Sequence, residues 1–138
     1  DAVDVMADLP WELKMPKIIG INLTGELPAG VASKDVILHL TGLLGAKGAT
    51  NAILEYFGPG CKNISSAGRA TICNMGAETG ATSSLFSADA TSREFLTKTG
   101  RPQAAKIVGQ YKACLKADQE VYGQPDKHYD QVMEIDLS

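Results

Sequence analysis

The stretch KIIGINLT, Lys17 to Thr24, predicts a buried β-strand around which the remaining elements can be arranged. It is rich in β-branched residues, and Pro16 and Gly25 bound it on either side. A short apolar run between such residues is typical of a strand that is covered by other elements. The fold is therefore expected to be built on a sheet that contains this segment.

A helix is expected directly after this strand. Ser33 can cap its first turn, and Gly45 and Gly48 can end it. Its expected apolar face consists of Val36, Ile37, Leu40, Leu43 and Leu44. A strand followed by an amphipathic helix indicates an α/β chain.

The alternation of strands and helices continues to the end of the chain. Further strands are predicted at Ala52–Tyr56, Ser83–Phe86 and Val132–Leu137, the last with one wet face or at an edge. Further helices are predicted at Ala67–Thr79, after a capping box of Thr91 and Glu94, and from Pro102 with the face Ala105, Ile107, Val108, Tyr111 and Leu115; Lys116–Asp126 is expected to be a polar loop. This order predicts a three-layer α/β/α domain with a mainly parallel sheet.

Composition limits the classes of function. The chain has 138 residues, 44% of them hydrophobic, which suits one globular domain. The net charge of -3 and the scattered Lys and Arg residues argue against a nucleic-acid partner. No apolar run approaches the roughly 20 residues that cross a bilayer, so no membrane partner is expected.

The cysteines and histidines do not form a recognisable metal site. Cys61, Cys73 and Cys114 are an odd set without a C-x-x-C pair, which is typical of reduced, non-structural thiols. His39 and His128 are far apart with no nearby ligand partner. We expect no metal ligands within this chain.

The segment ATICNMGAETGATSS, Ala70 to Ser84, contains an unusual polar pair. Asn74 and Glu78 stand four residues apart among small residues, a spacing that projects both from one face of a helix. From spacing alone, a solvated pair on a helix surface is the favoured interpretation.

A family resemblance changes that preference. The chain resembles the second domain of the aconitate hydratase family, in its mitochondrial branch, over nearly its whole length and in order. The resemblance rests on DAVDVMADLPWELK (1–14), NLTG (22–25), SKDVIL (33–38), TICNMGAETGAT (71–82), HYDQ (128–131) and EIDLS (134–138). The NMGAE form of the fourth motif is similar to aconitase rather than to its isopropylmalate or homoaconitate relatives.

The resemblance implies roles for two residues. Asn74 is expected to lie beside a 4Fe–4S cluster, as a cofactor-binding residue. Glu78 is expected to be catalytic, through a hydrogen bond to the water or hydroxyl on the open iron of that cluster, where a carboxylate can exchange a proton. The implied reaction interconverts citrate and isocitrate through cis-aconitate. Gly76 between the two residues is expected to leave room for the cofactor.

The resemblance also implies what lies outside this chain. The three cysteines that hold the cluster, the serine base and the substrate-binding arginines belong to other domains in that family. The chain starts at Asp1 within an apparent short helix and stops after a strand, so residues 1–138 are expected to be one domain of a larger mitochondrial matrix protein. The chain alone is expected to bind no cluster and to be inactive.

Two alternatives remain open. A non-catalytic aconitase-like module in a larger assembly is one, and a divergent paralogue that handles homoaconitate or homocitrate is the other. The second arises because Arg69 and Thr79 stand where the family usually has apolar residues, in addition to a variable surface loop at Glu26–Asp35. A buried arginine without a partner is costly, so Arg69 should reach solvent or an anion, or the packing must differ.

Overall fold

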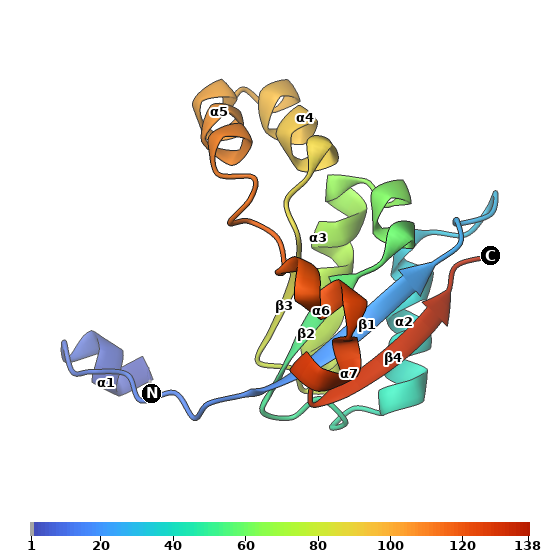
Figure 1. Cartoon of the computed structure of the whole chain (residues 1–138). Coiled ribbons are helices and arrows are strands. Elements are labelled where there is room, and N and C mark those ends of the chain that lie inside the picture. The colour runs from blue at the N-terminus through green and yellow to red at the C-terminus, as the bar shows by residue number, and fades with distance from the viewer. Residues whose placement is uncertain (1) are drawn as a thin grey trace.

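The computed structural model describes residues 2–138, which form a parallel α/β domain (Figure 1). Four strands pair in the order β3-β2-β1-β4, and every neighbouring pair is parallel. The elements are α1 (Ala2–Met6), β1 (Lys17–Thr24), α2 (Ser33–Leu44), β2 (Ala52–Phe57), η1 (Pro59–Asn63), α3 (Ser66–Met75), η2 (Gly76–Thr79), β3 (Ser83–Phe86), α4 (Ala90–Lys98), α5 (Pro102–Gln110), α6 (Gln119–Gly123), α7 (Pro125–His128) and β4 (Gln131–Asp136). The predicted fold class is confirmed.

Helices cover both faces of the sheet, which gives the three layers. The main core lies between the sheet and α2 with α3, where Ile21, Leu54 and Ile37 are completely buried. On the other face, where Figure 1 shows α6 and α7, the ring of Phe57 stacks on Tyr129 with centroids 5.3 Å apart and contacts Tyr122. Gly20 of β1 leaves the space that the Tyr129 ring fills, because a Cβ there would lie 2.4 Å from the ring.

Several local predictions are confirmed. The strands at 17–24 and 83–86 have the predicted bounds, and the predicted strand near the C-terminus is β4, at the edge of the sheet beside β1. The helix from Ser33 ends at Leu44 as expected, and Val36, Ile37 and Leu40 are buried. Local sequence signals were sufficient here because the apolar runs are short and bounded by glycine or proline.

Helix caps were predicted less well. The N-cap of α2 is Ala32, one residue before Ser33, and its backbone N–H donates to the carboxylate of Asp35 at 2.8 Å. The capping box at the start of α4 is formed by Asp89 and Ser92 rather than by Thr91 and Glu94. The Ser92 N–H donates to Asp89 Oδ1 at 3.1 Å. The carboxylate of Asp89 also pairs with a buried arginine, which is described below.

Other predictions were wrong about which side chains are buried and about which segments are helical. Leu43 is 54% exposed, and on α5 only Ala105 is buried, because α5 packs on α4 and this hairpin projects away from the sheet (Figure 1). The segment predicted as a polar loop contains α6, which Tyr122 anchors against Phe57. Both errors arise because the packing partner of each segment is fixed by the tertiary arrangement.

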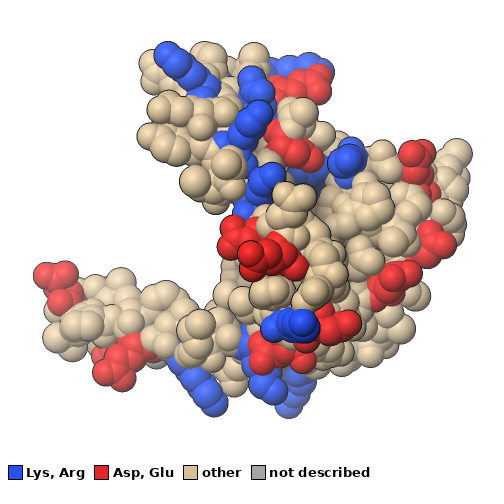
Figure 2. Space-filling view, in the orientation of Figure 1, with Lys and Arg blue, Asp and Glu red and all other residues tan. Residues whose placement is uncertain are grey.

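The surface of the domain has two features away from the sheet. Figure 1 shows the arm of residues 2–16 extending away from the sheet, and its exposed large apolar side chains are Val3, Val5, Met6, Leu9, Trp11, Leu13 and Met15. Figure 2 shows several Lys and Arg side chains over the α4–α5 hairpin, with Asp and Glu side chains beside them, and others at the opposite end of the molecule. Among residues 2–138, no helix combines the length and apolar character needed to span a bilayer.

Candidate functional site

Asn74 and Glu78 lie at the amino edge of the sheet. Helix α3 starts beside the carboxyl end of β2 and returns the chain to the start of β3, so its last turn reaches the edge where the strands begin. Asn74 is in that last turn, and Glu78 follows in η2. The N–H of Ala49 donates to the carbonyl of Thr79 at 2.9 Å and ties η2 to the turn before β2.

Both side chains are exposed. Within residues 2–138, neither takes part in a side-chain hydrogen bond or an ion pair. An amide and a carboxylate in this state are available to water or to a group outside the chain. The structure therefore brings the two predicted residues to one edge of the sheet and leaves their polar atoms uncommitted.

The local geometry differs from the continuous helix predicted for 67–79. The α-helix ends at Met75, and a 3₁₀ turn carries Glu78, because the chain must turn into β3. Gly76 is buried, and a Cβ there would lie 2.2 Å from Ser84 Oγ. The space at Gly76 is thus filled by β3, so the expectation that it admits a cofactor is wrong.

Arg69 and Thr79 are both buried inside the domain. Arg69 forms an ion pair with Asp89 at 2.6 Å, so the expected anion is supplied by the chain itself. The Thr79 hydroxyl donates to the carbonyl of Gly76 at 2.7 Å. Both side chains therefore satisfy their polar atoms inside the domain.

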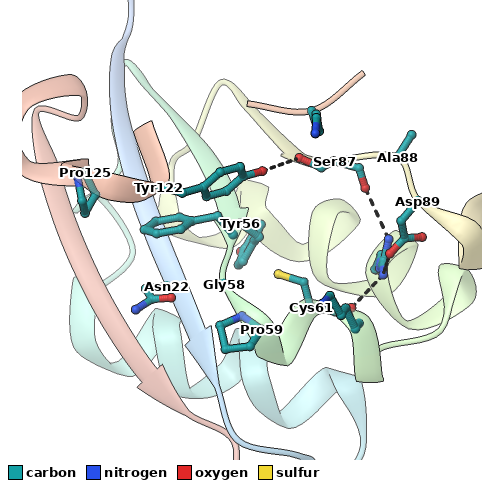
Figure 3. Close-up of a pocket in the computed structure, with 14 residues that line it drawn as sticks. Asn22, Tyr56, Gly58, Pro59, Cys61, Ser87, Ala88, Asp89, Tyr122 and Pro125 are labelled. Carbon is teal, nitrogen blue, oxygen red and sulfur yellow. Dashed lines mark hydrogen bonds and ion pairs between the residues drawn. The ribbon is translucent and has the colours of Figure 1, made fainter. Parts of the chain in front are cut away.

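A separate cavity lies at the opposite edge of the sheet (Figure 3). Its volume is about 610 Å³, and its walls include Asn22, Tyr56, Phe57 and Tyr122. The carboxyl ends of parallel strands commonly bind ligands, and the GPG turn after β2 was the sequence signal for such an edge. Asn74 and Glu78 are not among its lining residues.

The cysteines do not fit as ligands of an iron–sulfur cluster. Cys61 is in η1, Cys73 in α3 and Cys114 beyond α5, and nowhere in residues 2–138 do three His, Cys, Asp or Glu side chains converge. Burial raises the pKa of Cys61 to about 11 and also raises the pKa of Cys73, which favours the neutral thiol.

These pKa shifts predict the order of thiol alkylation. At pH 8, iodoacetamide should label exposed Cys114 at least about tenfold faster than Cys61, because the thiolate is the nucleophile and burial disfavours it. Raising the pH toward 11 should narrow the difference, since the Cys61 thiolate fraction then increases. Peptide mapping by mass spectrometry measures both rates, and equal rates at pH 8 would contradict the burial of Cys61.

Comparison with known proteins gives a consistent family match. The model of the aconitase family (aconitate hydratase) matches residues 1–138. The chain is 50% identical over its full length to "Aconitate hydratase, mitochondrial" of Schizosaccharomyces pombe, and 49% identical to the protein of that name in Saccharomyces cerevisiae. It is 52% identical over 99% of its length to "Probable aconitate hydratase, mitochondrial" of Caenorhabditis elegans. The chain spans 17% of the length of each of these relatives.

Proposed function

Because the chain belongs to the aconitase family, we propose that it forms one domain of an iron–sulfur hydro-lyase that interconverts citrate and isocitrate through cis-aconitate. The observation that carries this proposal is the family match over residues 1–138, with an intact N-M-G-A-E motif whose Asn74 and Glu78 are exposed and unpaired.

Glu78 is the proposed catalytic residue of this domain. Its carboxylate has no partner in the described part of the chain, so one oxygen can accept a proton from a substrate hydroxyl or water and return it later. Asn74 is the proposed cofactor-binding residue, whose amide would donate a hydrogen bond toward the cofactor. A 4Fe–4S cluster supplies an iron site that polarises a bound oxygen.

The proposed partners are the remaining domains of the same enzyme and its tricarboxylate substrates. The chain covers 17% of its relatives, so most of such an enzyme lies outside residues 1–138. The exposed apolar arm of residues 2–16 supports contact with those domains, since apolar stretches of this size are typical of interaction surfaces. The word "mitochondrial" in the relatives' names supports a location in the mitochondrial matrix.

The division of labour between domains can be tested directly. After anaerobic reconstitution with iron and sulfide, the 138-residue chain should show neither cluster absorbance nor conversion of citrate to cis-aconitate, because its cysteines do not converge. The longer protein that contains this segment should show both. A stable cluster on the 138-residue chain would overturn the assignment of its ligands to other domains.

The activity of the longer protein tests the proposed reaction itself. A longer protein that binds a cluster but converts neither citrate nor isocitrate would contradict the proposed reaction. Activity on homoaconitate alone would instead identify the divergent paralogue.

A further inference from the structure

The placement of Asn74 and Glu78 depends on the position of helix α3. Neither side chain forms a hydrogen bond or an ion pair with another described residue, so no local contact orients them. Their position toward any group outside the chain is set by the backbone of α3 and η2. The contacts that fix the position of α3 therefore also determine where Asn74 and Glu78 lie.

Steric contacts limit how closely α3 approaches its neighbours. A Cβ on Gly68 would lie 2.2 Å from Ser33 Oγ of α2, and Gly76 approaches Ser84 of β3 equally closely. Ile72 between them is completely buried. The two glycines let the helix approach its neighbours closely, and the burial of Ile72 is non-directional, so neither supplies a hydrogen bond that orients the helix.

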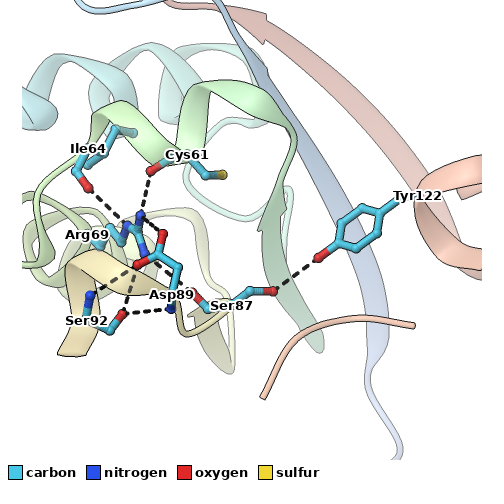
Figure 4. Close-up of polar contacts among 7 residues, drawn as sticks. All are labelled: Cys61, Ile64, Arg69, Ser87, Asp89, Ser92 and Tyr122. Carbon is cyan, nitrogen blue, oxygen red and sulfur yellow. Dashed lines mark hydrogen bonds and ion pairs between the residues drawn. The ribbon is translucent and has the colours of Figure 1, made fainter. Parts of the chain in front are cut away.

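Directional contacts come from Arg69 in the first half of α3 (Figure 4). Its Nε donates to the carbonyl of Ile64 at 3.1 Å, and one terminal nitrogen donates to the carbonyl of Cys61 at 2.7 Å. These two acceptors lie in and just after η1. All three guanidinium nitrogens are engaged, and the side chain is only 7% exposed.

The remaining Arg69 contacts reach the connection between β3 and α4. The other terminal nitrogen, Nη1, donates to the carbonyl of Ser87 at 3.4 Å. The nitrogen that donates to Cys61, Nη2, also forms the ion pair with Asp89, at 2.6 Å. Partial burial acts to raise the pKa of Asp89, but the hydrogen bond and positive charge of Arg69, together with the backbone N–H groups of Ser92 and Thr91, outweigh it and hold that pKa below its usual value. The guanidinium also lies over the Phe86 ring, 5.6 Å from its centroid.

We propose that Arg69 is a positioning residue that fixes the rotation of α3 and thereby the placement of Asn74 and Glu78. A planar guanidinium with acceptors on two separate segments resists rotation of the helix that carries it. Asn74 follows Arg69 by five residues in the same helix, so a rotation at Arg69 is transmitted to it. What the two residues contact rests on the proposed function; that Arg69 orients them does not.

Three variants separate positioning from simple charge balance. Arg69→Met removes all the directional contacts and leaves the Asp89 carboxylate without its cation. The double variant Arg69→Met with Asp89→Asn also removes that charge. Arg69→Lys keeps a cation near Asp89 but lacks the planar fork that reaches the carbonyls of η1, and it serves if Arg69→Met fails to fold. Lys62→Met, which replaces an exposed cation in η1 at the opposite edge of the sheet from Asn74, is the matched control.

The first measurement is made on the 138-residue chain and needs no cofactor. The side-chain amide resonances of Asn74 in ¹⁵N–¹H spectra should shift in Arg69→Met, in Arg69→Lys and in the double variant, and should stay unchanged in Lys62→Met. Unchanged Asn74 resonances in the arginine variants would overturn the proposal, whatever the longer protein does.

The second measurement uses the cluster-loaded longer protein. Arg69→Met should lower kcat at least about tenfold with KM within about twofold, because misplaced catalytic groups slow chemistry more than binding. The double variant should regain thermal stability but not kcat. Recovery of kcat together with stability would mean that Arg69 only neutralises Asp89. A parent protein without hydratase activity would defeat the proposed function and leave the spectral result to decide the positioning role.

Discussion

Glu78→Gln in the longer protein is expected to lower kcat by about 10²- to 10⁴-fold, the usual loss when one acid–base group is removed. Glutamine has nearly the same shape but cannot take up a proton. Because Glu78 is exposed and unpaired in this domain, the fold and the cluster should survive the change. KM should change less than kcat, since the family resemblance implies that the substrate-binding arginines belong to other domains. Steady-state kinetics with cluster spectroscopy measure both quantities.

A surface glutamate elsewhere on the domain provides the control. Glu26→Gln also replaces an exposed carboxylate and should leave turnover unchanged, with stability altered by about 0.5 kcal/mol or less. If Glu78→Gln behaved in the same way, with kcat within about twofold of the parent and the cluster intact, Glu78 would be ordinary surface. A silent Asn74→Ala as well would favour the interaction-module alternative, because an amide beside a cluster should alter its spectrum.

Gly58→Ala is expected to destabilise the domain by about 4 kcal/mol, the sum of backbone strain and overpacking. Gly58 links β2 to η1 with φ of 96° and ψ of 171°, a conformation that is essentially restricted to glycine. A Cβ there would also lie 2.6 Å from the carbonyl oxygen of Leu23 and 2.2 Å from Asn22 Oδ1, so the backbone of β1 would have to move. Urea unfolding of the 138-residue chain measures the loss.

Gly30→Ala separates the two contributions to this effect. Gly30 also has a positive φ, 91°, but nothing lies within 4 Å of a Cβ built on it. Its replacement should cost only about 1 kcal/mol, from backbone strain alone. Equal losses for the two variants would mean that the approach of Gly58 to β1 contributes nothing to stability.

The strands could be predicted almost to the residue, and the helix caps could not. A run such as KIIGINLT predicts a strand from residues that are adjacent in the sequence. The predicted bounds of β1 and β3 were therefore correct. The Asp89 carboxylate that caps α4 also pairs with Arg69, twenty residues earlier in the chain. That pairing leaves no local signal in the sequence, and Thr91 with Glu94 also matches a capping-box pattern.

The candidate site could likewise be predicted only in part from the sequence. The N-M-G-A-E motif identified Asn74 and Glu78 from sequence, and their roles stay predictions. The sequence could not indicate that Gly76 packs on Ser84, or that the α-helix stops at Met75 before Glu78. Those outcomes depend on how tightly α3 lies against β3, which is a property of the packed layers.

The sequence by itself determined the order of the strands and of the helices up to α5, the parallel α/β class and the family, because each of these is carried by short runs and motifs along the chain. The tertiary structure alone decided that Arg69 is buried beside Asp89 and that Tyr122 anchors α6 on Phe57. It also decided that Asn74 and Glu78 remain open at the amino edge of the sheet. The physical reason is that burial and polar pairing join groups from distant segments, and their energies exist only once the layers have packed.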